Sequence, residues 1–265
     1  TDDPDDDEKL MNEVVVYEGL HTYGGMAGRT MEMLARGLVE MCDEDEVHWV
    51  MQQTERFTQR LRDGAVPLER GCDGAYIETW RFLPHIEANA QDTFSAALYQ
   101  MSGVRAIAHG RVGRDDYVPV QIPRLAMTNE QLDQVADAII SLYKQREKIL
   151  PMQLHGHGEF RDQMEYHGVL PDLECHEFDT FPYEIHTIER IGNLDRRARE
   201  RAIRAAGYNT FLLRSADVAI DLLTDSGTSA MSTEQWAAYD ATPAVTGDSA
   251  AYRKLVSNLR DITGY

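Results

Sequence analysis

The sequence contains few lysines, few cysteines and no long apolar run. Its only lysines are Lys9, Lys144, Lys148 and Lys254. No stretch of about 18 apolar residues is present, so we expect no membrane span. The three cysteines are scattered and odd in number, which argues against a disulfide framework and favours a reducing cytoplasm. The opening residues have neither a basic region nor an apolar core after it, so no signal peptide is expected.

Basic residues are scarce beside acidic ones. The chain carries 26 Lys and Arg against 45 Asp and Glu, a formal net charge of −19. Such an acidic surface repels phosphate backbones, so we expect no binding to nucleic acid. The excess of acid fits a chain kept soluble in high salt, and it fits equally an acidic protein with a disordered tail. At 265 residues and 43% hydrophobic, the chain can form one large domain or two small ones.

Residues 13–150 mix helical and strand periods. Helices are predicted over 26–42, 46–64, 91–103 and 129–150, and strands over 14–19, 74–83, 104–112 and 116–124. Met31, Leu34, Leu38 and Met41 form the expected apolar stripe of the first helix. Thr128 and Gln131 predict a capping box. Pro119 makes the last strand an edge strand or a bulge. This order indicates a small α+β layer.

The rest of the chain divides into a tail, a connector and a second segment. Residues 1–12 predict a disordered acidic tail. Residues 151–185 have no persistent period and predict a connector. In 186–265 we expect a helix over 194–207, an apolar run at 218–223, a capping box from Ser232 to Gln235, and a last helix over 249–262.

The connector region is rich in potential metal ligands. These are His155, His157, His167, Cys175, His176, His186, Glu159, Glu174 and Glu177. An H-x-H pair near carboxylates is able to bind zinc, but the spacings match no recognised ligand pattern. Polar connectors also often collect histidine, so the metal site is the minor interpretation.

Two glycine-containing loops precede helices. HTYGGMAGR at 21–29 and TDSGT at 224–228 could each offer backbone N–H groups or hydroxyls to an anion. On their residues alone, ordinary turns explain both loops better. No nucleophile elbow, P-loop or dinucleotide fingerprint is present.

Two longer segments resemble a known family. VVVYEGLHTYGGMAGRTMEMLARGL, continuing through RFLPHI, SGVRA and IPR, resembles the C-terminal part of the tryptophanase and tyrosine phenol-lyase family of pyridoxal-phosphate β-eliminating lyases. RARERAIRAAGYNTFLLRSADVAIDLLTDSGTSAMSTEQWA resembles that family's N-terminal part. The resemblance covers about 14–150 and 186–265, and the two parts stand in reversed order.

The resemblance implies a fold. Both parts contribute to the small domain of the type I aminotransferase fold, an α/β (α+β) domain with a short, mostly antiparallel sheet covered by helices. The chain therefore resembles a circular permutant of that small domain and its adjoining arm. Residues 151–185 would then join what are the C-terminal and N-terminal ends of the family's chain. Adjacent chain ends make such a permutation mild in physical terms.

The resemblance also implies missing cofactor residues. The family's middle segment holds the Schiff-base lysine in a Ser-x-Lys-Lys context and a Gln-Gly-Arg phosphate cup, and neither is in this sequence. The four lysines are expected on solvated helix faces or in the acidic tail. Pyridoxal phosphate would then be bound only with a partner chain that carries the large domain.

Several positions match family site residues. The resemblance places Thr224, Ser226, His21, Tyr23, Arg124 and His109 on the substrate and cofactor side. It also places the Gly227 carbonyl at a site for a monovalent cation such as K⁺. Arg29 also matches a family arginine. The residue at His109 helps to sort phenol from indole substrates in the family.

Other positions depart from the family. Pro119 stands where the family has the arginine that binds the substrate carboxylate, although Arg111 and Arg114 lie just upstream. Val245 and Pro243 stand in the segment that supplies a tyrosine acid and a cation-binding glutamate. Proline cannot replace a bidentate arginine, and loss of a general acid typically costs roughly two to four orders of magnitude in rate.

Three functions follow as alternatives. The chain could be a lyase subunit, completed by a large-domain chain or by self-association, that converts an aromatic amino acid to indole or phenol, pyruvate and ammonia. It could be a non-catalytic binding or regulatory relative, or the remnant of a rearranged gene. It could be a metal-binding module built on the histidine-rich connector.

Overall fold

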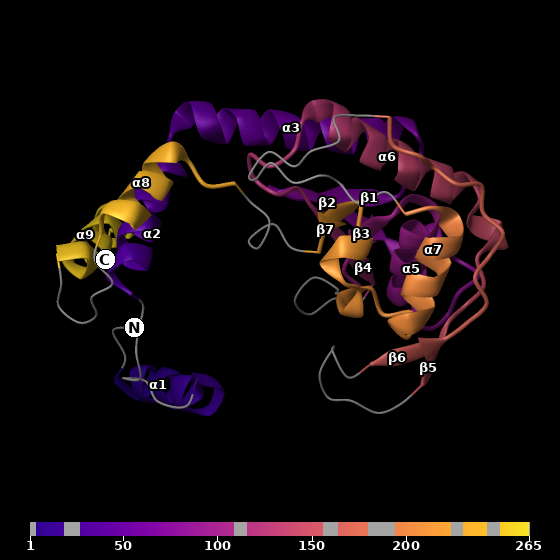
Figure 1. The fold of residues 1–265 in the computed structure, drawn as a ribbon, viewed down its shortest axis with the longest axis horizontal. Helices are drawn as coiled ribbons and strands as arrows, with labels where there is room; N and C mark the ends of the chain where they lie inside the picture. The colour runs from indigo at the N-terminus through magenta and orange to yellow at the C-terminus, as the bar shows by residue number, and fades with distance from the viewer. Residues whose placement is uncertain are drawn as a thin grey trace. The chain divides into compact units, whose positions relative to one another are not determined.

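The computed structural model describes seven stretches of the chain. They are residues 4–18, 27–108, 116–155, 164–179, 194–223, 230–242 and 250–264. The chain divides into two compact units, the first formed by 1–47 with 231–265 and the second by 48–230. Each unit therefore has its own packing (Figure 1).

Among the described residues, three small sheets lie in the second unit. An antiparallel sheet has the order β1-β2-β4, a parallel pair joins β3 to β7, and an antiparallel hairpin joins β5 to β6. The strands are β1 (Leu68–Arg70), β2 (Gly74–Glu78), β3 (Val104–Ala106), β4 (Tyr117–Gln121), β5 (Gln153–His155), β6 (Glu165–His167) and β7 (Ile220–Leu222). The expected mixture of helices with short, mostly antiparallel sheets is confirmed.

Helices surround these sheets, and one helix, α5 (Ala90–Ser102), lies at the centre of the unit. The others are α3 (Glu44–Asp63), α4 (Thr79–Phe82), α6 (Asn129–Lys144) and α7 (Arg196–Ala205), with 3-10 turns η1 (Arg146–Lys148), η3 (Thr210–Leu212) and η4 (Ser215–Asp217). Every residue of α5 from Asp92 to Ser102 is buried, as expected for a helix enclosed on all sides. Its side chains Phe94, Leu98 and Met101 belong to the main apolar core of the unit.

The ends of α6 and α7 follow the sequence signals. The Thr128 hydroxyl accepts the Gln131 N–H at 3.1 Å while the Gln131 side chain accepts the Thr128 N–H at 2.9 Å, so the predicted capping box is confirmed. Gly207 has φ +57 just after α7, the left-handed conformation that ends many helices. α6 and α3 run side by side, joined by ion pairs from Arg56 to Asp133 and from Arg60 to Asp137 (Figure 1).

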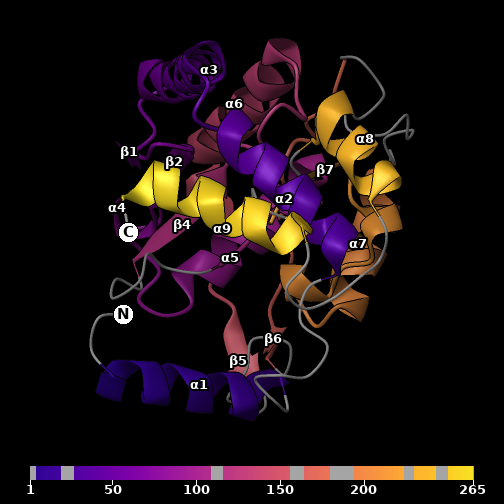
Figure 2. The ribbon, with the colours of Figure 1, turned by 90° about the vertical axis from the view of Figure 1, so that its left-hand side faces the viewer.

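The first unit is a group of helices built from both ends of the chain. It contains α1 (Pro4–Glu18), α2 (Gly28–Glu40), α8 (Thr233–Ala241) and α9 (Ala250–Thr263). α2 packs against both α8 and α9 (Figure 2). The apolar contact between α2 and α9 is made by Met31, Ala35, Ala251 and Leu255.

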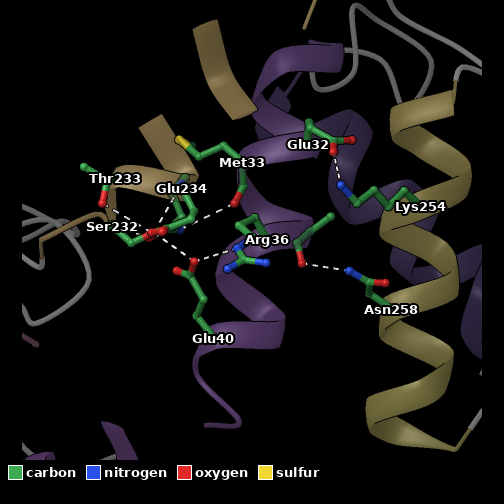
Figure 3. A network of polar contacts seen from close by, with 11 residues as sticks. Glu32, Met33, Arg36, Glu40, Ser232, Thr233, Glu234, Lys254 and Asn258 are labelled. Carbon is green, nitrogen blue, oxygen red and sulfur yellow. Dashed lines mark hydrogen bonds and ion pairs between the residues drawn. The ribbon is translucent and has the colours of Figure 1, made fainter. Parts of the chain in front are cut away.

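Polar contacts reinforce this helical group. Lys254 pairs with Glu32, and the Asn258 side-chain amide donates to the Ala35 carbonyl at 2.8 Å (Figure 3). The Ser232 hydroxyl caps α8, donating to Glu40 at 2.9 Å and accepting the N–H of Gln235 at 3.0 Å. The predicted capping box at Ser232 is thus confirmed.

Several sequence predictions about local structure are wrong in part. Residues 14–18 belong to helix α1 and not to a strand, and α1 also takes in the predicted acidic tail from residue 4 onward. Pro4 followed by three aspartates suits a first helical turn, because proline fits there and acids favour the positive helix end. The residues that α2 buries include Ala35 and Gly37, whereas Leu34 and Met41 are exposed.

Further corrections concern element length and the connector. The strand predicted over 74–83 ends at Glu78, and the helix predicted to 150 ends at Lys144 with a 3-10 turn after it. The connector contains the hairpin β5–β6, which the sequence prediction missed. In the stretches that the structure describes, no helix is long and apolar enough to span a membrane.

Candidate functional site

The carboxyl ends of two parallel strands mark the candidate site. In the pairing of β3 with β7, Arg105 lies opposite Asp221 and Ala106 lies opposite Leu222. Parallel strands end at the same edge of a sheet, and ligands of α/β proteins commonly bind beyond that edge. Both strands lead directly towards residues that the sequence selected, His109 after β3 and Thr224 after β7.

A buried ion pair joins the two strands. The Arg105 guanidinium contacts both carboxylate oxygens of Asp221, one of them at 3.0 Å, and it also donates to the Leu213 carbonyl at 3.0 Å. The same carboxylate accepts the Leu223 N–H at 2.9 Å. Only 8% of the Arg105 side chain and 21% of the Asp221 side chain are exposed. The pair therefore fixes the backbone immediately before the TDSGT segment.

The far side of that segment is fixed as well. The Ala230 N–H donates to the carbonyl of Arg124 at 2.9 Å. On the β3 side, the Thr210 hydroxyl donates to the Ala106 carbonyl at 2.8 Å. Leu223 and Ala230, the described residues on either side of 224–229, are thus held by Asp221 and by Arg124 respectively.

Buried polar groups of α5 and α7 support the same strands. The Tyr99 hydroxyl donates to the Asp217 carbonyl at 2.6 Å, and burial, with a smaller contribution from the Asp217 charge, raises the pKa of Tyr99 to about 12. The Arg199 guanidinium donates to the carbonyls of Gln100 and Met101, each at 3.1 Å. These contacts tie α7 and the approach to β7 onto the central helix.

Gly103 allows the close approach of α5 to β7. It has φ +82, and its carbonyl accepts the Ala219 N–H at 3.1 Å. A Cβ atom at this position would lie 3.0 Å from the Ala219 Cβ. Glycine is needed here for both the backbone conformation and the space.

Most sequence-selected site residues lie outside the residues that the structure describes. These are His21, Tyr23, His109, Arg111, Arg114, Thr224, Ser226, Gly227, Pro243 and Val245. Among those that it describes, Arg124 is half-buried after β4. Arg29 lies on α2 with its guanidinium 5.2 Å from the centre of the Tyr239 ring.

Pro119 occupies a buried position in β4, opposite Tyr76 of β2. β4 is an edge strand of its three-stranded sheet, which confirms the prediction made from the proline. A proline ring cannot donate a hydrogen bond from its side chain. The position that the resemblance assigns to a carboxylate-binding arginine therefore offers no charge here.

The lysines do not provide an anchor for pyridoxal phosphate. All four are described by the structure and all four are exposed. Lys9 pairs with Asp6 at 3.2 Å, Lys148 contacts Gln145 at 3.3 Å, and Lys254 pairs with Glu32. Lys144 is exposed at the end of α6. A Schiff-base lysine needs surroundings that favour its neutral amine, such as a buried apolar pocket. These exposed lysines therefore do not fit the cofactor.

Only some of the potential metal ligands of the histidine-rich connector are shown to lie close together. Within the described stretches, no group of three or more His, Cys, Asp or Glu could hold a metal ion. His155 and His167 meet across the β5–β6 hairpin, with ring centres 4.2 Å apart. The His176 ring packs against Phe178, with ring centres 5.4 Å apart, and burial lowers the pKa of its imidazole. His157, Glu159 and His186 lie outside the described residues.

The Arg105–Asp221 pair was missed by sequence reasoning. Its signal in the sequence is a pair of short apolar runs, VRA and IDL, each with one charged residue at its centre. The two charges have opposite signs. A lone charge in a buried strand needs a partner, so two such strands predict each other. Nothing in the sequence, however, states that these two runs are neighbours.

The known proteins that the chain resembles belong to one class of enzyme, the lyases. No family model matches the chain. It is 36% identical to the tyrosine phenol-lyase of Nostoc punctiforme over 56% of the chain and 35% of the relative. It is 34% identical to that of Symbiobacterium sp. over 56% of the chain and 36% of the relative. It is 36% identical to that of Fusobacterium nucleatum over 53% of the chain and 34% of the relative.

The chain is thus related to the tyrosine phenol-lyases and, through them, to the tryptophanase and tyrosine phenol-lyase family. It spans about a third of the length of the curated relatives that it matches. The family relationship expected from the sequence is confirmed.

Proposed function

We propose that the chain is the small-domain portion of a pyridoxal-phosphate-dependent carbon–carbon lyase of the tyrosine phenol-lyase and tryptophanase type. In this proposal it is a circular permutant of the small domain of the type I aminotransferase fold. Its substrate would be an aromatic amino acid, converted to phenol or indole, pyruvate and ammonia. The Schiff-base lysine would come from a partner chain.

The pairing of β3 with β7 carries the proposal. β3 belongs to the segment that resembles the family's C-terminal part, and β7 belongs to the segment that resembles its N-terminal part. The two segments share one core, in which Val104 and Ala106 pack with Ile220 and Leu222. Segments from opposite ends of the family's sequence thus build one unit, which is what a permuted small domain requires.

The connector supports the permutation. The Tyr166 N–H in β6 donates to the Gly207 carbonyl after α7 at 2.7 Å, and the Asn89 side chain before α5 donates to the Met152 carbonyl at 3.0 Å. The connector therefore contacts both segments that it joins. Thr224 and Ser226 would face the cofactor, and the Gly227 carbonyl would contribute to a K⁺ site.

The need for a partner follows from the lysines. None of the four is buried, and three are engaged by Asp6, Gln145 and Glu32. The lysine must therefore come from outside these 265 residues. We expect the partner to carry the Ser-x-Lys-Lys and Gln-Gly-Arg motifs and to be encoded nearby, or the chain to associate with further copies of itself.

Co-expression with such a neighbouring chain tests the proposal. We expect a yellow complex that releases pyruvate and ammonia from tyrosine or tryptophan. A Thr224→Val, Ser226→Ala double variant should lose this release while still binding the partner, because each substitution removes only a hydroxyl group and keeps a side chain of similar size. A colourless mixture without association, or turnover unchanged in the double variant, would contradict the proposal.

A non-catalytic binding or regulatory role is the second candidate, and Pro119 favours it. The buried proline in β4 cannot hold a substrate carboxylate. This alternative predicts a partner complex that forms without releasing pyruvate from either amino acid. Restoring the charge with Pro119→Arg distinguishes the two: a gain of turnover in the complex would indicate a lyase site that lacks only this contact.

A further inference from the structure

The β5–β6 hairpin is held firmly on the second unit. At the start of β5, the Met152 carbonyl accepts from Asn89 at 3.0 Å. At β6, the Tyr166 N–H donates to the Gly207 carbonyl at 2.7 Å, and the Tyr166 side chain is 3% exposed. Both strands are therefore fixed to the body of the unit, and side chains on their outer face keep a defined spacing.

Two histidines lie together on that outer face. In the hairpin register, His155 lies opposite Glu165 and His167 lies opposite Gln153. Residues two apart on a strand share a face, so His155 and His167 are diagonal neighbours on one side, while Tyr166 points to the other side. Both histidines are exposed, and their ring centres are 4.2 Å apart.

We propose that His155 and His167 form a binding site for one divalent transition-metal ion of the Zn²⁺ or Ni²⁺ class. Neutral imidazole suits these ions, and a Zn–N bond is about 2.0–2.1 Å long, so two rings already in contact can approach one ion with small side-chain rotations. The site rests on the connector alone and is independent of the proposed lyase function.

The surroundings define the kind of site. Glu165 shares the face, but its side chain lies against Gly207, where an added Cβ would be 2.9 Å from the Glu165 Cγ. No third ligand completes a cluster among the residues that the structure describes. The site is therefore a pair of imidazoles with water in the remaining positions, which is open to an additional ligand and not a closed structural zinc site.

Metal titration of the full chain tests the proposal. After treatment with a chelator, the protein is titrated with ZnCl₂ and separately with NiCl₂ in a calorimeter. We expect saturable binding of one ion that weakens at least tenfold in His155→Ala and in His167→Ala, since even the loss of an outer contact typically costs about 10–100-fold in affinity. Mg²⁺, which prefers oxygen ligands, should not compete.

A third histidine provides the matched control. His48 is exposed on α3, and its ring contacts the Gln52 side chain at 2.7 Å, one turn along the same helix. His48→Ala should leave the affinity unchanged. In the unaltered chain, the ring proton signals of His155 and His167 should move or broaden first as metal is added. Unchanged affinity in both hairpin variants, equal weakening in His48→Ala, or no binding at millimolar metal would overturn the proposal.

Discussion

Removing the charge of Asp221 should destabilise the second unit through Arg105. The Arg105 guanidinium contacts Asp221 twice and the Leu213 carbonyl once, and its side chain is 8% exposed. Breaking a buried pair by removing one partner costs roughly 3–5 kcal/mol. Because a fifth of the Asp221 side chain remains in water, we expect about 3 kcal/mol for Asp221→Ala.

Two further variants separate the contributions. Asp221→Asn keeps an acceptor for the Leu223 N–H, which lies 2.9 Å from the carboxylate, so it should be about 1 kcal/mol less destabilising than Asp221→Ala. An Arg105→Met, Asp221→Leu double variant leaves no unpaired charge. Its loss in free energy of unfolding should be much smaller than the sum of the losses for Arg105→Met and Asp221→Leu alone. The difference, which is the coupling energy of the pair, should be about 1–3 kcal/mol.

Urea unfolding followed by tryptophan fluorescence measures these differences. Trp49 and Trp80 lie in the second unit and Trp236 lies in the first, so a Trp236→Phe background restricts the signal to the second unit. Additive effects of the two single changes, or a loss below about 0.5 kcal/mol for Asp221→Ala, would refute the view that the pair acts as one buried contact.

Three other changes have expected outcomes. Gly103→Ala should lower the free energy of unfolding by about 1–3 kcal/mol, because it combines φ +82 with a Cβ contact of 3.0 Å to Ala219; urea midpoints measure this, and an unchanged midpoint would contradict it. Gly37→Ala should destabilise the first unit by displacing the side chain of Gln235, yet in a Gln235→Ala background it should stabilise it by up to about 1 kcal/mol; thermal melts of both pairs test the change of sign. Burial lowers the pKa of His176, so the unfolded chain takes up a proton at higher pH than the folded chain, and stability should fall as pH drops below about 6.5. His176→Gln should reduce that loss in urea unfolding at pH 7.5 and 5.5, and an equal loss in both proteins would exclude this cause.

Local signals in the sequence predicted much of the secondary structure. The capping boxes at Thr128 and Ser232 and the glycine after α7 mark helix ends because they satisfy backbone groups within a few residues. The run VVV at 14–16 misled, since β-branched residues favour strands while the preceding acids and Pro4 favour a helix start. The β5–β6 hairpin was missed because strands of three residues show too little alternation to be recognised.

The candidate site was predictable only through resemblance. TDSGT alone is indistinguishable from a turn, and it becomes informative when β7 is seen to pair with β3. That pairing depends on Arg105 and Asp221, which are 116 positions apart, and no local pattern encodes it. Pro119 was recognised correctly as an edge-strand residue because its effect on the backbone is local.

The β3–β7 pairing also sets an order for folding. β3 lies in the first half of the chain, yet its partner is made only when synthesis reaches residue 222. The first unit has the same property, because the Ala35 carbonyl accepts from Asn258, 223 positions later. Contacts this distant in sequence require large loops to close first, which slows folding. On the ribosome, the apolar faces of β3 and α2 would therefore stay exposed until β7 and α9 have been made, and chaperone protection during that time would govern the yield of folded protein.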